Sequence, residues 1–125
     1  MNNPKKLLWV FTLAILLMAG WHMARAGGEP ETIKGYILDS ACAFTKNLKK
    51  PISAECAVAC AKAGSPLVIL TDNGTIYWPI SDSMPAQGQN ERLMEFAGKR
   101  VAVTGKVYQR AGSRAVVIAT IEALK

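Results

Sequence analysis

The stretch "RVAVTGKVY", Arg100 to Tyr108, decides the fold. Val101, Val103 and Val107 alternate with other residues, which predicts a strand with one buried face. Gly105 stands among these valines, and a glycine inside a strand is typical of a bulge, a bend or a close contact. The stretch leads into a turn and a last apolar segment, and this combination favours a small barrel.

The rest of the chain adds four strand patterns and two helix patterns. The expected strands are 33–38, 67–70, 75–78, 100–108 and 115–124, and the expected helices are 54–63 and 90–98, the latter capped by Asn90. We therefore predict a mainly β fold: a small, five-stranded, partly closed OB-like barrel, with a cysteine-bearing helix after the first strand and a short helix before the fourth. The alternative is an open antiparallel sheet with the helix packed on one face.

The N-terminal segment has the pattern of a secretory signal peptide. It begins with the basic "MNNPKK", continues with an uncharged apolar run over 7–24, and ends with the small residues of "ARA" at Ala26. This order of basic, apolar and small residues predicts cleavage after Ala26. The alternative is an uncleaved membrane anchor formed by Leu7–Met23, because about 18 apolar residues can just cross a bilayer.

The predicted organisation is a signal peptide over 1–26, a polar tether over 27–32 and an OB-like domain over 33–125. Whether the first segment is cleaved or kept as an anchor, we expect the domain to lie outside the cytoplasm, in the periplasm or the extracellular space. If the segment is not cleaved, the domain is held at the membrane.

Charge and histidine content narrow the function classes. The first 26 residues contain Lys5, Lys6 and Arg25 but no acid, so their removal lowers the formal net charge from +6 to +3. So small an excess of positive charge, on a protein expected to be exported, argues against a nucleic-acid partner. His22 is the only histidine, and its loss would leave no Ser-His-Asp or Cys-His nucleophile. We predict a protein that is not an enzyme.

Three cysteines stand out in so short a chain. Cys56 and Cys60 lie in "AECAVAC", and Cys42 precedes them. An oxidising compartment makes a disulfide the default. Residues four apart on a helix hold their Cβ atoms about 5–6 Å apart, whereas a disulfide needs about 3.5–4.5 Å. We therefore expect Cys42 to pair with Cys56 or with Cys60, and the remaining cysteine to be a small buried side chain.

Two other uses of the cysteines stay open. Three thiolates suit a soft ion such as Cu(I), or zinc if a fourth ligand is added. Asp39, close before the first cysteine, is the nearest candidate for that ligand. A redox thiol is the third possibility, since a cysteine in the first turn of a helix has a lowered pKa. However, the spacing is not that of a thioredoxin-like C-x-x-C motif.

Three segments, "GYILDSACA", "ECAVACAKAGSPLVIL" and "AGKRVAVTGKV", resemble an uncharacterised family of small exported bacterial proteins. The pattern is Asp-Ser-x-Cys, then Cys-x-x-x-Cys, then Val-x-Val-x-Gly, and it covers most of the domain. The matching positions are Asp39, Ser40, Cys42, Cys56, Cys60 and Gly105. The family often has a histidine soon after its first cysteine, but "AFTK" stands here instead. The resemblance implies the barrel and a joint role for the cysteines, and it assigns no activity.

A basic and aromatic face is the remaining candidate site. OB domains use such a face to bind oligonucleotides or oligosaccharides. The candidate residues are Tyr77, Trp78, Lys106, Tyr108, Arg110 and Arg114. The alternative is a solvated hairpin beside a tryptophan of the core.

Together these features predict an exported, non-enzymatic binding domain stapled by a disulfide. Its ligand would be a soft metal or another component of the cell envelope. The first alternative is an accessory subunit of a membrane complex, anchored by Leu7–Met23. The second is a thiol redox protein.

Overall fold

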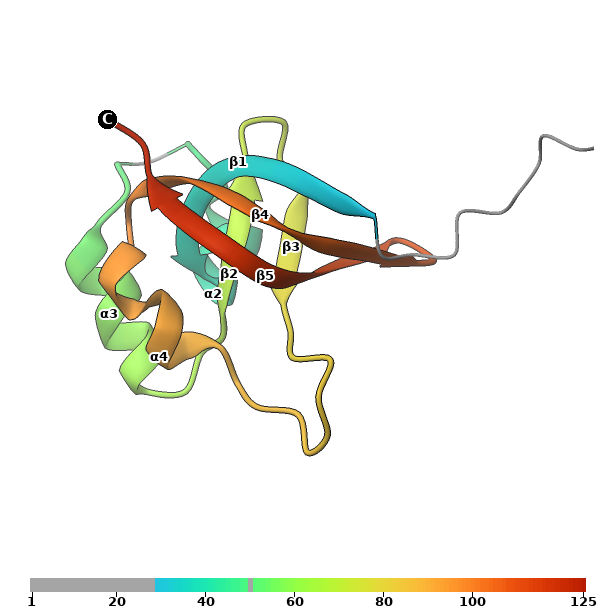
Figure 1. The fold of residues 1–125 in the computed structure, drawn as a ribbon. Helices are drawn as coiled ribbons and strands as arrows, with labels where there is room; N and C mark the ends of the chain where they lie inside the picture. The colour runs from blue at the N-terminus through green and yellow to red at the C-terminus, as the bar shows by residue number, and fades with distance from the viewer. Residues whose placement is uncertain (1–28, 50) are drawn as a thin grey trace, which may run out of the picture.

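The structure, a computed structural model, describes residues 29–49 and 51–125. The expected signal peptide or anchor lies outside these residues. Within them, no helix is long and apolar enough to cross a membrane. The described chain forms a closed five-stranded barrel, and the helices Ala54–Lys62 and Asn90–Leu93 lie together at one end of it (Figure 1). This confirms the predicted mainly β, OB-like fold, and the barrel is closed rather than partly closed.

The strands follow the order β1-β2-β3-β5-β4 around the barrel. Their bounds are β1 Pro30–Asp39, β2 Leu67–Thr71, β3 Ile76–Pro79, β4 Arg100–Arg110 and β5 Ser113–Ala123. Neighbours are antiparallel except β3 and β5, which run parallel where Tyr77 faces Arg114. This last pairing closes the sheet, so the alternative of an open sheet is wrong.

β1 is long enough to pair on both of its edges. Residues 35–39 pair with β2, and residues 30–36 pair with β4. The strand therefore begins at Pro30, inside the segment 27–32 that was expected to be a tether. The long β4 provides the reason, since it offers Pro30 and Glu31 the partners Lys106 and Gly105.

The interior of the barrel is an aliphatic core with one aromatic ring. Its buried residues are Ile33, Ile37, Ala61, Leu67, Ile69, Tyr77, Leu93, Val101, Val103, Val116 and Ile118. Most point inward from alternate strand positions, as period-two patterning requires. Ala61 and Leu93 reach the core from the helices α3 (Ala54–Lys62) and α4 (Asn90–Leu93).

A second, smaller core covers the outside of β1 and β2. Leu38, Val68 and Leu70 project outward from these strands and pack with Ala43 of the helix α2 (Ser40–Thr45). A strand that is buried on both faces reads as a continuous apolar run. This explains the sequence "LVIL" of β2, which lies between the barrel interior and α2.

Gly105 marks the sharpest irregularity of the sheet. Thr104 pairs with Thr120 but Gly105 pairs with Ile118, so the register shifts between these positions and Ala119 is the extra residue. A Cβ atom on Gly105 would overlap the carbonyl oxygen of Val117 and lie 3.0 Å from its carbon. The predicted bend and close contact are confirmed.

The helices differ from the prediction in two places. The sequence of residues 39–50 predicts a loop with room for one helical turn, and this segment contains the six-residue helix α2. Asp39 caps the first turn of α2 by accepting a hydrogen bond from the Cys42 amide at 3.0 Å. The helix expected over 90–98 is shorter, with α4 followed by the 3-10 helix η2 (Met94–Phe96). Asn90 does not cap it, since Gln89 occupies the cap position. The Asn90 side chain instead bonds to Ala61, Ser65 and Leu67.

Candidate functional site

A groove of about 480 Å³ opens where three segments of the barrel meet. The segments are α2 in the connection from β1 to β2, the start of β3, and the turn between β4 and β5. The lining residues are Phe44, Gly74, Thr75, Ile76, Trp78, Gly112, Ser113 and Arg114. The connections between strands 1 and 2 and between strands 4 and 5 are those with which OB domains bind oligonucleotides and oligosaccharides.

Two aromatic rings form one wall of this groove. Phe44 is 66% exposed, and its ring centroid lies 6.2 Å from that of Trp78, with 37° between the ring planes. α2 explains the exposure, since Ala43 points into the smaller core and Phe44 follows it on another side of the helix. Together, Phe44 and Trp78 give the groove an apolar aromatic wall.

Arg114 contributes the positive charge of the groove and is held by Tyr77. Its guanidinium donates a hydrogen bond to the Tyr77 hydroxyl at 3.2 Å and lies 5.8 Å from the centroid of that ring. Tyr77 itself is only 8% exposed and belongs to the barrel core. Of this pair, Arg114 is available to a ligand, and Tyr77 positions it.

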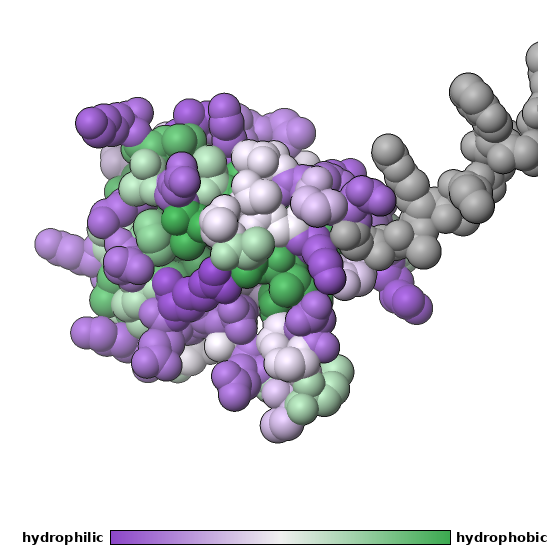
Figure 2. Space-filling view, viewed as in Figure 1, coloured by the Kyte–Doolittle hydropathy of each residue, from purple (hydrophilic) through white to green (hydrophobic). Residues whose placement is uncertain are grey.

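The rest of the predicted basic face lies beside the groove. Tyr108 and Arg110 line a second hollow of about 370 Å³, and Arg114 lines both hollows. Lys106 is exposed and lines neither. Figure 2 shows the molecule from the side of Figure 1, where hydrophilic side chains alternate with small apolar patches. Because its members line two different hollows, the candidate face is divided, and Trp78 and Arg114 are its two members in the larger groove.

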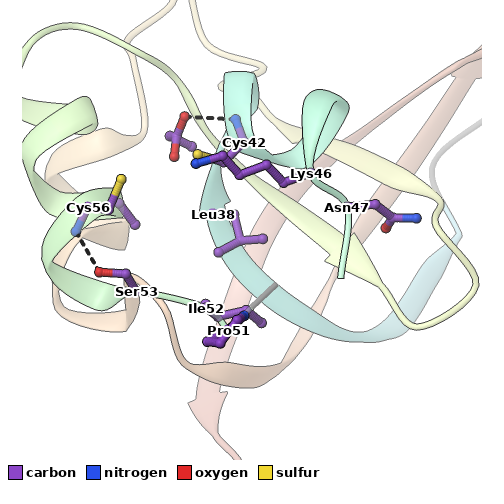
Figure 3. Close-up of a pocket in the computed structure, with 10 residues that line it drawn as sticks. Leu38, Cys42, Lys46, Asn47, Pro51, Ile52, Ser53 and Cys56 are labelled. Atoms are coloured by element: carbon purple, nitrogen blue, oxygen red, sulfur yellow. Dashed lines mark hydrogen bonds between the residues drawn. The ribbon is translucent and has the colours of Figure 1, made fainter. Parts of the chain in front are cut away.

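The cysteines lie at a separate place, around a cavity of about 50 Å³ between α2 and α3. Cys42 from α2 and Cys56 from the first turn of α3 line it, with Lys46 extending beside Cys42 (Figure 3). Cys60 does not line this cavity. All three cysteines are free in the structure.

The buried carboxyl group of Asp39 dominates the electrostatics of this cavity. Asp39 is 1% exposed. Its hydrogen bond to the Cys42 thiol, the burial of that thiol and the charge of Asp39 raise the pKa of Cys42 from 9.0 to about 11, against a lowering by Lys46. Burial, the charge of Asp39 and a hydrogen bond with Cys56 raise the pKa of Cys60 as well. Both thiols are therefore protonated at neutral pH.

The candidate metal ligands share a region but are not arranged as a metal site. Among residues 29–49 and 51–125, no three His, Cys, Asp or Glu side chains converge closely enough to hold an ion. The Cu(I) or zinc site with Asp39, Cys42, Cys56 and Cys60 stays a prediction, and so does the disulfide.

Phe44 is the site residue that sequence reasoning missed. It lies in "DSACAFT", which was expected to be mainly loop. The signal for the helix was Asp39 itself, because an Asp directly before helix-forming residues is typical of an N-cap. A helix starting at Ser40 would have placed Cys42 and Phe44 on different sides.

A scan against protein-family models and searches of curated proteins and of solved structures found no match to this chain. The residues of the groove and of the cysteine cavity are therefore interpreted from their own chemistry.

Proposed function

We propose that the protein is an exported, non-enzymatic binding domain whose ligand lies in the groove between Phe44, Trp78 and Arg114. The observation that carries the proposal is the exposed Phe44 ring, 6.2 Å from Trp78, in the same groove as the guanidinium of Arg114. An aromatic wall and one oriented charge are the usual parts of a small-ligand site, where apolar contact supplies affinity and a polar group fixes orientation.

The chemistry of the groove favours an acidic oligosaccharide. The apolar faces of sugar rings stack on aromatic side chains, and the two rings offer such surfaces. Arginine binds a carboxylate with two parallel hydrogen bonds, and the Tyr77 hydroxyl holds Arg114 in place at 3.2 Å. A position outside the cytoplasm favours a saccharide over a nucleic acid, although OB domains bind both.

The cysteine cavity supports a binding rather than a redox role. The thiolate is the nucleophile in thiol chemistry, and Asp39 raises the pKa of Cys42 to about 11. A catalytic thiol needs the opposite shift. The second predicted alternative, a thiol redox protein, is accordingly the less favoured proposal.

Trp78 provides the test, because it is the only tryptophan of residues 27–125. Its fluorescence is titrated with trigalacturonate, with neutral maltotriose and with a thymidine hexanucleotide. We expect the acidic saccharide to change the emission at the lowest concentration. A response to the hexanucleotide alone, or to none of the three up to millimolar concentration, would contradict the proposal.

Single substitutions test whether the ligand binds in this groove. Arg114→Gln removes a charged hydrogen-bond donor, for which a loss of about 1.5–3 kcal/mol, or about 10- to 150-fold in affinity, is expected. Phe44→Ala removes the exposed ring and is expected to weaken binding with little effect on folding. Lys106→Gln is the matched control, since Lys106 is an exposed cation outside the groove.

A further inference from the structure

We infer that Cys42 and Cys56 form the disulfide of the oxidised protein, and that this bond fixes α2, with the groove residue Phe44, against α3. Cys42–Cys56 is one of the two pairings that the sequence leaves open. Such a bond would also connect the cysteine cavity to the groove, which lies on the other side of α2. The pairing itself does not depend on the proposed ligand.

The cavity between the two helices selects the pair. Cys42 from α2 and Cys56 from α3 both line this cavity of about 50 Å³. In Figure 3, Cys42 lies on the side of α2 that faces α3, and Cys56 projects from the first turn of α3. Cys60 lies one helical turn further along and does not line the cavity.

Exposure gives the same assignment. Cys56 is exposed, whereas Cys42 and Cys60 are half-buried. An external disulfide can therefore reach Cys56 first, and the nearest thiol outside its own helix is that of Cys42. Cys60 is excluded as the partner of Cys56 because residues four apart on an intact helix hold their Cβ atoms too far apart.

The bond forms by exchange with a small-molecule disulfide. The Cys56 thiolate attacks one sulfur of that disulfide and forms a mixed disulfide with it. The S–S bond of the small molecule breaks, and its other half leaves as a thiol with the proton that Cys56 lost. The Cys42 thiolate then attacks the Cys56 sulfur, and the second small thiol leaves with the proton of Cys42. Two cysteines are oxidised and one external disulfide is reduced to two thiols.

The position of Cys42 on α2 links this bond to the groove. α2 has six residues, and Cys42 and Phe44 are two positions apart in it. Each residue turns an α-helix by about 100°, so their side chains leave the helix in nearly opposite directions. Within α2 only Ala43 is buried. A covalent bond to α3 at Cys42 would therefore restrict the helix whose other side presents Phe44 to Trp78.

Peptide mapping tests the pairing. Protein comprising residues 27–125 is oxidised with oxidised glutathione, blocked with iodoacetamide and digested without reductant. We expect a Cys42–Cys56 crosslink and an alkylated Cys60. Cys60→Ala, which matches the alanines on either side of it, should leave the crosslink intact, whereas Cys42→Ala and Cys56→Ala should abolish it. A Cys42–Cys60 crosslink in the unsubstituted protein would overturn the assignment.

Hydrogen exchange tests the effect on α2. In the Cys60→Ala protein, oxidation should slow exchange of the α2 amides at least tenfold and change the quenching of Trp78 by acrylamide. The Cys42→Ala protein, treated in the same way, is the control and should show neither change. Equal exchange of α2 in the oxidised and reduced Cys60→Ala protein would refute the coupling. Neither readout uses a groove ligand, so failure here is distinct from failure of the proposed function.

Discussion

The guanidinium of Arg92 donates a hydrogen bond to the carbonyl oxygen of Ile118 at 2.9 Å, and a second one to that of Ala119 at 3.1 Å. Ala119 is the extra residue of the β5 bulge. A bulge interrupts the hydrogen bonds between neighbouring strands. Arg92 of α4 provides the donor for the two carbonyl groups at this bulge. The short helix thereby fixes the place where the barrel bends.

We predict that Arg92→Ala destabilises the domain by about 1–2 kcal/mol, because two carbonyl groups at the bulge lose a charged donor. Arg92→Lys should recover only part of the loss, since an ammonium group cannot reproduce the fork of a guanidinium. Urea unfolding measures both variants. Lys99→Ala is the control, an exposed cation beyond η2. Equal stability of all three variants would show that the bulge does not need Arg92.

Gly105→Ala should destabilise the domain by about 1–3 kcal/mol, the usual cost of inserting an atom into a packed site. The added Cβ would overlap the Val117 carbonyl oxygen, so β4 and β5 must separate at the bulge. Thermal unfolding measures the loss, with Gly88→Ala as control, because a Cβ at Gly88 meets nothing within 4 Å. An unchanged melting temperature for Gly105→Ala would contradict the close packing of these strands.

Phe44→Ala should shift the emission of Trp78 to longer wavelength, because the indole loses its aromatic neighbour and contacts more water. The free energy of unfolding should change by less than about 0.5 kcal/mol, as for other exposed positions. In the protein comprising residues 27–125 the measurement has no competing tryptophan. Thr45→Ala on the same helix is the comparison. An unshifted spectrum would mean that Phe44 does not cover Trp78 in solution.

Alkylation of Cys42 by iodoacetamide should be slow at pH 7 and rise about tenfold per pH unit towards pH 11, because only the thiolate reacts and the pKa of Cys42 is raised to about 11. Asp39→Asn keeps an acceptor for the helix cap but removes the charge that raises this pKa. It should therefore accelerate alkylation at pH 8. Asp82→Asn, at an exposed loop acid, should not. Peptide-level mass spectrometry under reducing conditions measures the rates.

The native protein should begin at Gly27, since "ARA" ends the predicted signal peptide. N-terminal sequencing of the protein purified from its native cell tests this prediction. A chain that begins at Met1 or Asn2 would instead support the alternative of a membrane-anchored subunit. The measurement is independent of the groove and of the cysteines.

The strands could be predicted because their signals are local. Alternating valines and Gly105 indicate a bent strand in β4, and "TDNG" indicates the turn between β2 and β3. Asn90 was misassigned because its partners lie 23–29 positions away, at Ala61, Ser65 and Leu67. An asparagine before a helical pattern is typical of a cap, and only the packing of α3 against α4 directs its amide elsewhere.

The residues of the candidate site were also predicted only in part. Trp78 and Arg114 were predicted from their chemistry, and the groove contains both. Phe44 was not, because its role depends on which side of α2 faces the barrel. Tyr77 was predicted as a surface residue, yet the inward position of alternate β3 residues puts its ring in the core.

The double pairing of β1 has a consequence for the order of folding. Pro30 pairs in register with Lys106, so the first strand of the barrel cannot complete its pairing until β4 is present. Contacts so distant along the chain close slowly, since the entropy of a long loop is lost before any contact compensates it. A chain emerging N-terminus first would expose the apolar face of β1 until β4 had followed.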